Sequence, residues 1–78
     1  MLNMAVKAMC IVVRSEEGRG AIGVRVDNDE NVYFPLSVTE ALELEEFEEV
    51  EAIMVRNDRT EPAWRAIRAR LPGAERPQ

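Results

Sequence analysis

The side chains that could do chemistry in this sequence are mainly those of arginine and glutamate. The 78 residues include no histidine and a single cysteine, Cys10. The chain therefore lacks the side chain that most often transfers protons near neutral pH and most often binds metal ions. Cys10 lies in the apolar run 9–13. We interpret it as a small buried hydrophobic residue, because no imidazole is present to activate it. We expect no catalytic activity, no metal site and no cofactor.

Charge is distributed unevenly along the chain, whose formal net charge is −5. Seven glutamates and no basic residue lie between positions 40 and 55, whereas residues 56–78 include six arginines and three acidic residues. An acidic total argues against binding to duplex DNA by neutralising many phosphates, but it leaves room for a local arginine-bearing face. The glutamates are most simply a solvated surface. Alternatively, they could bind a cation or imitate phosphates toward a basic protein.

Runs of strand-favouring apolar residues, some of them alternating with polar ones, predict four β-strands separated by turn-forming residues. Ile22, Val24 and Val26 alternate with small or polar residues, so we expect these three side chains to form the buried face of their strand. Pro35 should end the next strand, because it has no backbone N–H to donate to a neighbouring strand. The expected strands cover residues 5–14, 22–26, 32–34 and 50–56.

A short helix is expected between the third and fourth of these strands. Ser37 and Glu40 have the spacing of a capping box, in which each side chain bonds a free N–H at the start of a helix. Residues that favour helices follow directly. The sequence therefore predicts one or two helical turns from Thr39 to about Phe47.

Residues 61–71 are compatible with either a helix or a strand. Pro62 near the first helical position favours a helix, as do the apolar residues Trp64, Ile67 and Leu71 at three- and four-residue spacing. Alternation of polar and apolar residues within the same segment favours a strand less strongly. Local signals alone therefore favour a helix, and the alternatives stay open at this level.

Three segments of the chain resemble parts of cold-shock domains. The sequence of residues 31–38, N-V-Y-F-P-L-S-V, resembles the second ribonucleoprotein motif of that family, D-V-F-V-H-F-S-A. Residues 19–24, R-G-A-I-G-V, fall on the first motif, K-G-F-G-F-I, at the separation that the family shows. Residues 61–67 are similar to the closing strand, G-P-Q-A-A-N-V. Together these matches cover about residues 5–71.

This resemblance implies an all-β fold, a small five-stranded antiparallel OB-type barrel. It also implies a short helical turn between strands three and four. In such a barrel residues 61–71 contain the fifth strand rather than a helix. The expected organisation is a single domain over residues 1–72 with a flexible tail at 73–78.

The resemblance also implies that the second and third strands present aromatic rings to single-stranded RNA or DNA. Unpaired bases stack on such rings without requiring a particular sequence. Most of the ring positions are changed here, which implies weak binding. Ala21, Gly23 and Leu36 replace phenylalanines, Pro35 replaces a histidine, and Arg14 replaces a tryptophan, so that Tyr33 is the ring retained at a matching position.

Arginines could replace part of the lost stacking surface, because a guanidinium plane can stack on a base and also contact a phosphate. The expected nucleic-acid-binding residues are Arg14, Arg19, Arg25 and Tyr33. Arg25 is included because it has the same alternation as positions 21 and 23. The alternative is that these arginines are ordinary solvated charges on a half-exposed sheet.

The remaining aromatic residues, Phe34, Phe47 and Trp64, are expected in the core because the chain has few large side chains with which to build one.

Two functions remain in view. The first is a regulatory module that binds single-stranded RNA or DNA weakly. The second is an acidic protein-interaction module, an inhibitor or regulator that binds a basic partner through Glu45, Glu46, Glu48 and Glu49. The N-terminal residues do not resemble a signal peptide, and the uncharged runs are too short to span a bilayer. We therefore expect a cytoplasmic protein that does not bind membranes. Separately, we expect a monomer, with a dimer formed through an incompletely closed sheet edge as the alternative.

Overall fold

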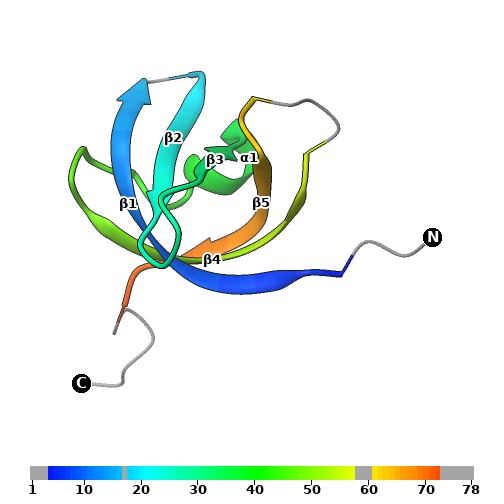
Figure 1. Cartoon of the computed structure of the whole chain (residues 1–78). Helices are drawn as coiled ribbons and strands as arrows, with labels where there is room; N and C mark the ends of the chain where they lie inside the picture. The colour runs from blue at the N-terminus through cyan, green and yellow to red at the C-terminus, as the bar shows by residue number, and fades with distance from the viewer. Residues whose placement is uncertain (1–3, 17, 58–60, 73–78) are drawn as a thin grey trace.

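Five strands and one short helix build the computed structural model of the chain, which describes residues 4–16, 18–57 and 61–72 (Figure 1). The helix α1 separates the third and fourth strands, as expected. The elements in chain order are β1 (Val6–Glu16), β2 (Gly20–Arg25), β3 (Asn31–Phe34), α1 (Leu36–Thr39), β4 (Glu49–Arg56) and β5 (Trp64–Arg70).

The strands form a closed barrel in the order β1-β2-β3-β5-β4, with β4 returning to β1. The neighbouring pairs are antiparallel except for β3 and β5, which are parallel and join Val32 to Trp64 and Tyr33 to Arg65. The expectation of a purely antiparallel barrel is therefore wrong for this pair. The chain crosses between β3 and β5 through α1 and β4, so β5 returns in the direction of β3. This all-β arrangement is compatible with an OB-like fold.

The core fills the inside of the barrel with small and medium-sized side chains. Cys10, Phe34 and Trp64 belong to it, as predicted, and are almost completely buried. Burial raises the pKa of the Cys10 thiol to about 11, so this thiol is protonated at neutral pH. Valine, alanine and methionine side chains complete the core, namely Val12, Ala21, Val32, Val50, Ala52, Met54 and Ala66, and Leu44 joins them from the loop before β4.

Strand β2 turns the opposite face inward from the one predicted. Ala21 and Gly23 face the core, whereas Ile22 and Val24 lie on the half-exposed outer face. The reason is lack of space on the inner side of β2. A Cβ atom at Gly23 would lie 2.9 Å from the carbonyl oxygen of Ile11 and 3.0 Å from the Cε1 atom of Phe34. Small residues are therefore needed on the inner face of β2, and the larger apolar residues face outward.

Helix α1 lies earlier in the chain than the predicted helix at 39–47, and the predicted capping box does not form. Pro35 precedes the helix with extended backbone angles, and Ser37 lies within the helix rather than at its cap. Glu43 and Phe47 have positive φ angles of 52° and 69°, which a right-handed helix cannot contain. The chain after α1 instead forms turns that bring Leu44 into the core.

The ambiguous segment at 61–71 contains the strand β5. Trp64 and Ala66 point into the barrel and Arg65 points outward, so pairing with both β3 and β4 outweighs the local helical signals. Ile67, part of the predicted helical stripe, lies at a register shift against β4 and is 45% exposed. The expected turn at 58–60 and tail at 73–78 lie outside the described residues. In the described part of the chain, no helix is long and apolar enough to cross a membrane.

Candidate nucleic-acid interface

Four outward-facing residues form a row across neighbouring strands of the barrel. Arg14 on β1 pairs with Ile22 on β2, Ile22 pairs with Tyr33 on β3, and Tyr33 pairs with Arg65 on β5. Arg14 and Arg65 are exposed and Tyr33 is half-buried. Because adjacent strands lie about 4.8 Å apart, the Cα atoms of the two arginines are separated by roughly 14 Å, with the tyrosine ring between them. We call Arg14, Ile22, Tyr33 and Arg65 the outer row.

A surface hollow joins Arg19 to one end of this row. Arg14, Arg19 and Tyr33 all line the hollow, which also includes Glu16 and the N-terminal residues of β2. The structure therefore brings together three of the four predicted nucleic-acid-binding residues. The hollow has a volume of about 190 Å³. This is too small to enclose a nucleotide-sized ligand, so a ligand here would lie along the surface.

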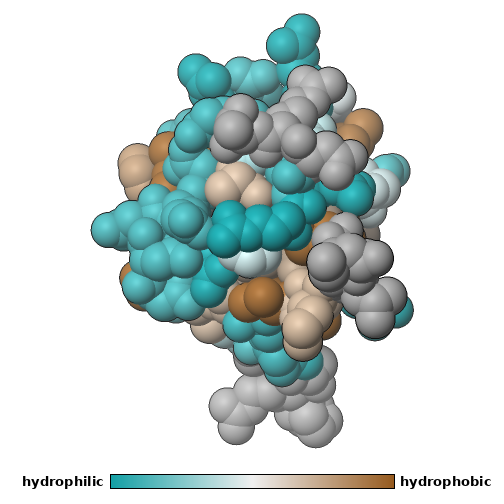
Figure 2. All heavy atoms as spheres, turned by 45° about the vertical axis from the view of Figure 1, so that its right-hand side comes forward, coloured by the Kyte–Doolittle hydropathy of each residue, from teal (hydrophilic) through white to brown (hydrophobic). Residues whose placement is uncertain are grey.

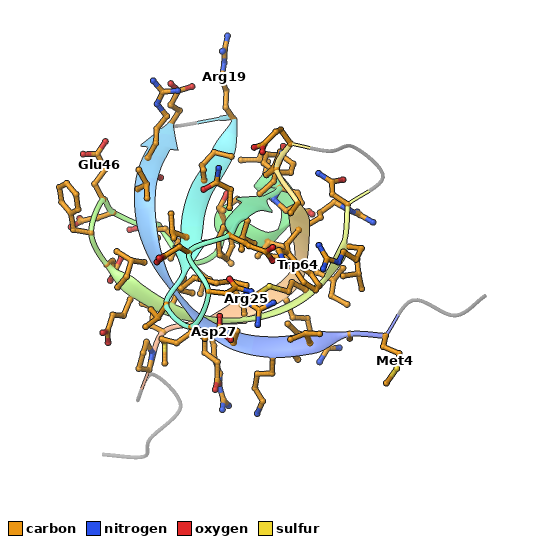
Figure 3. The ribbon with its side chains drawn as sticks, in the orientation of Figure 1. Met4, Arg19, Arg25, Asp27, Glu46 and Trp64 are labelled. Atoms are coloured by element: carbon orange, nitrogen blue, oxygen red, sulfur yellow. The ribbon has the colours of Figure 1, made fainter. Side chains whose placement is uncertain are left out.

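Two glycines position Arg19 at the tip of the β1–β2 hairpin. Gly18 and Gly20 have φ angles of 79° and 89°, in the left-handed region that favours glycine. The N–H of Arg19 donates to the carbonyl oxygen of Glu16 at 3.0 Å and closes the turn. Gly20 also lies so close to β3 that a Cβ atom there would overlap the carbonyl oxygen of Phe34. The resulting tight turn directs the Arg19 side chain away from the barrel (Figure 3).

Glu16 lies between the two arginines of the hollow. One carboxylate oxygen is 3.9 Å from Nε of Arg14, and the other is 3.9 Å from Nη1 of Arg19. The Arg14 and Arg19 side chains are 70% and 80% exposed, so these loose ion pairs contribute little to stability. The Glu16 carboxylate matters for binding rather than for stability. It lies between the two guanidinium groups, where a phosphate that bridges them would lie, and its negative charge would oppose that phosphate.

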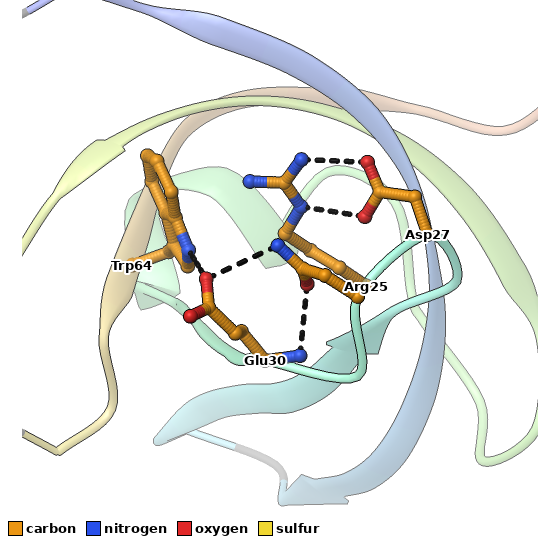
Figure 4. A network of polar contacts seen from close by, with 5 residues as sticks. Arg25, Asp27, Glu30 and Trp64 are labelled. Atoms are coloured by element: carbon orange, nitrogen blue, oxygen red, sulfur yellow. Dashed lines mark hydrogen bonds and ion pairs between the residues drawn. The ribbon is translucent and has the colours of Figure 1, made fainter.

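Arg25 is not part of this surface, so its predicted position on the same outward face is wrong. It is the last residue of β2 and lies on the same inner face as Ala21 and Gly23, and its side chain is 9% exposed. Its guanidinium group binds both carboxylate oxygens of Asp27, with Nε···Oδ1 at 2.9 Å and Nη2···Oδ2 at 2.6 Å (Figure 4). These hydrogen bonds raise the pKa of Arg25 and hold the pKa of Asp27 below its ordinary value. The Asp27 carboxylate therefore balances the buried positive charge of Arg25.

The indole ring of Trp64 is also unavailable to a ligand. Its Nε1–H donates to Oε1 of Glu30 at 2.7 Å, and the Cζ atoms of Arg25 and Arg56 lie 4.9 and 4.3 Å from the ring centroid. Asn28 in turn holds Glu30, donating to the same Oε1 at 3.2 Å and accepting from the Glu30 N–H at 2.9 Å (Figure 4). This network ties the β2–β3 turn to the start of β5, so Trp64 has a structural role.

Sequence reasoning missed Arg65. The resemblance implies a strand in this segment, but it gives neither the pairing of that strand with β3 nor the register that places Arg65 beside Tyr33. The available signal was the inward position of Trp64: once residue 64 of a strand is buried, residue 65 must point outward. Arg68, further along β5, is exposed as well and pairs with Ile53 of β4.

The predicted protein-interaction residues lie in the loop that leads into β4 and at the first residue of that strand. Glu45, Glu46 and Glu49 are exposed, and Glu48 is half-buried with its Oε1 accepting from the N–H of Glu45 at 3.0 Å. Glu46 points away from the barrel (Figure 3). Phe47 in the same loop is 76% exposed, so its prediction as a core residue is wrong. The cause is the preceding turn, which places Leu44 in the core instead.

Polar residues cover most of the face shown in Figure 2, with small groups of apolar residues between them. Among the residues that the structure describes, no group of three or more histidine, cysteine, aspartate or glutamate side chains is placed to hold a metal ion. Comparison of the chain with protein-family models, with curated proteins and with solved structures found no match. The fold and the arrangement of these side chains are therefore the basis for any functional conclusion.

Proposed function

We propose that this chain is a non-catalytic, cold-shock-like module that binds single-stranded RNA or DNA weakly. The observation that carries the proposal is the outer row, in which two exposed arginines lie on either side of Tyr33, with Arg19 at the adjoining hollow. A regulatory role in the cytoplasm is part of this proposal.

The chemistry of the row suits an unpaired strand rather than a duplex. The Tyr33 ring can stack on one base, which contributes about 1–3 kcal/mol. Arg14 and Arg65 are placed to contact phosphates on either side of that base, and Ile22 offers apolar surface between Arg14 and Tyr33. One ring and a few phosphate contacts support only weak binding, with a dissociation constant on the order of 10–100 µM at low salt.

The position of the row on the barrel supports the same function. OB-type barrels bind oligonucleotides on their second and third strands and on the loops that join strands one to two and four to five. Ile22 and Tyr33 lie on β2 and β3, and Arg19 lies in the β1–β2 loop. The first motif gives the proposal no support on β2, because Ala21 and Gly23, at the family's phenylalanine positions, face the core rather than the surface. The support from the resemblance therefore comes from the second motif, which contains Tyr33.

Fluorescence anisotropy of labelled oligo-U and oligo-dT at low salt tests the proposal. Tyr33→Leu removes the ring while keeping an apolar side chain, and it should weaken binding about tenfold. Arg65→Gln should also weaken binding, whereas Lys7→Gln provides a control that makes the same change of charge at an exposed residue of β1, outside the row. Absence of binding at high micromolar protein, or equal effects of the Arg65 and Lys7 substitutions, would reject the proposal.

A further inference from the structure

Apolar side chains lie at neighbouring outward positions of β1, β2 and the loop before β4. β1 contributes its outward residues, and Ile11 pairs with Val24 of β2. The N–H of Val26 donates to the carbonyl oxygen of Met9 at 2.9 Å, which extends the surface past the end of β2. Val13 and Val26 are 46% and 56% exposed. We call this surface the apolar strip and define it as Met9, Ile11, Val13, Val24, Val26 and Phe47.

Phe47 is the most exposed member of the strip, yet its backbone is fixed against β1. Its N–H donates to the carbonyl oxygen of Val12 at 2.6 Å, and the N–H of Val12 donates to the carbonyl oxygen of Glu48 at 2.9 Å. These bonds continue the pairing of β1 with β4 beyond Ile11 and Glu49. The backbone of Phe47 is thus held against β1, while its side chain is on the outside of the barrel. A large apolar side chain fixed in this way is typical of a contact surface.

Acidic residues border the strip along β4 and its preceding loop. Glu49 pairs with Ile11 and Glu51 pairs with Met9, while Glu46 and Glu48 flank Phe47 in the chain. Glu51 is engaged by Arg70 at 2.7 Å, so the other three carboxylates carry the negative field of this border. An occupant must therefore combine apolar side chains with positive charge. A second copy of the same face is disfavoured, because it would place glutamates against glutamates.

We propose that the apolar strip binds a basic segment of another protein, in which apolar side chains alternate with lysine or arginine. This goes beyond nucleic-acid binding and uses a different surface, since phosphates would be repelled by the glutamate border. The apolar side chains of the segment would pack on Phe47 and Val13. Its cationic groups would meet Glu46, Glu48 and Glu49. The two surfaces adjoin at Val13 and Arg14, so the protein could bind both kinds of partner on neighbouring faces.

Titration of the ¹⁵N-labelled protein with two short blocked peptides tests this inference. One peptide alternates lysine with valine, and the other alternates lysine with serine. The lysine–valine peptide should shift the amide signals of Ile11, Val13 and Phe47, and it should bind at least about tenfold more tightly than the lysine–serine peptide. Phe47→Ser should weaken its binding by a similar factor. Ile67→Ser is the matched control, because Ile67 is also an exposed apolar residue but lies on β5.

Several outcomes would overturn the inference, and each has a distinct signature. Equal binding of the two peptides would show attraction by the glutamates alone. Unchanged affinity of Phe47→Ser would exclude the strip. Self-association of the free protein in analytical ultracentrifugation that Phe47→Ser abolishes would identify a second copy as the occupant. Shifts of the same amides by oligo-U would assign the strip to nucleic acid. The first three results do not depend on whether the outer row binds oligonucleotides.

Discussion

Tyr33 and Arg65 lie side by side on the parallel strands β3 and β5, with both side chains on the outer surface of the barrel. The two residues are far apart in the sequence, and the only parallel pair of strands among the described residues brings them together. An aromatic ring beside a guanidinium group is a suitable contact for a base and its phosphate. This relationship is the structural centre of the proposed nucleic-acid interface.

Removing the carboxylate of Glu16 should strengthen binding to single-stranded nucleic acid. Glu16 lies between Arg14 and Arg19 at 3.9 Å from each and competes with a phosphate for both. Glu16→Gln should therefore lower the dissociation constant for oligo-U about two- to fivefold at low salt. Asp29→Asn, in the exposed β2–β3 turn, makes the same change of charge away from the hollow and should have a smaller effect. Equal strengthening by both substitutions would indicate only a change in net charge.

The two glycines of the β1–β2 hairpin should differ in their tolerance of alanine. Both have positive φ angles, so either substitution incurs a backbone penalty of about 1 kcal/mol. At Gly18 no atom would meet the added Cβ, whereas at Gly20 it would overlap the Phe34 carbonyl oxygen and lie 3.2 Å from the Leu36 nitrogen. Gly20→Ala should therefore lower the free energy of unfolding by about 2–3 kcal/mol or more. Urea denaturation of both variants measures the difference, and equal losses would contradict the close approach.

The ion pair of Arg25 and Asp27 should make stability depend on pH in the acidic range. Hydrogen bonds from Arg25 hold the pKa of Asp27 below its ordinary value. The ionised carboxylate consequently stabilises the fold above the pKa of Asp27 in the unfolded chain, and this contribution is lost as the pH falls through the lower pKa of the folded state. Asp27→Asn should reduce the thermal midpoint at neutral pH and flatten its decline below about pH 4. An unchanged acid profile in this variant would contradict the pairing.

Cys10 should be unreactive in the folded protein and should limit stability at alkaline pH. Burial raises the pKa of its thiol from 9.0 to about 11. The unfolded chain therefore loses this proton at a lower pH than the folded chain, and the stability that the buried thiol contributes is lost as the pH rises from about 9 to about 11. Cys10→Ala should weaken this alkaline decline. A thiol-specific reagent should modify wild-type Cys10 rapidly only in denaturant; rapid modification under native conditions would contradict its burial.

Four of the five strands could be predicted from the residue pattern, and the fifth from the resemblance to cold-shock domains, because its own local signals favour a helix. The face that each strand turns inward could not always be predicted. In β2 the pattern favours Ile22 and Val24 as core residues, but Ala21 and Gly23 face the core, and a Cβ at Gly23 would meet the Ile11 backbone and the Phe34 ring. This packing relationship joins neighbouring strands and is not visible within any one of them. The misplacement of Arg25 follows from the same error.

The errors in the loops have a different physical origin. Phe47 is apolar, and composition alone therefore favours a core position. Its exposure results from the turns after α1, in which Glu43 and Phe47 adopt positive φ angles that their residue types do not favour. Arg65 was missed because its position depends on the parallel pairing of β5 with β3, which an expected antiparallel barrel does not include. In both cases long-range packing decides the structure.

The central claim, that the outer row binds single-stranded nucleic acid, is tested most directly by titrating the ¹⁵N-labelled protein with oligo-U at low salt. The row predicts that the largest changes in amide chemical shift fall on Ile22, Tyr33 and Arg65, with further changes at Arg19, and that added salt reverses them because phosphate contacts release counterions. The absence of shifts at high micromolar oligonucleotide would contradict the account, as would shifts centred on Arg25 and Trp64.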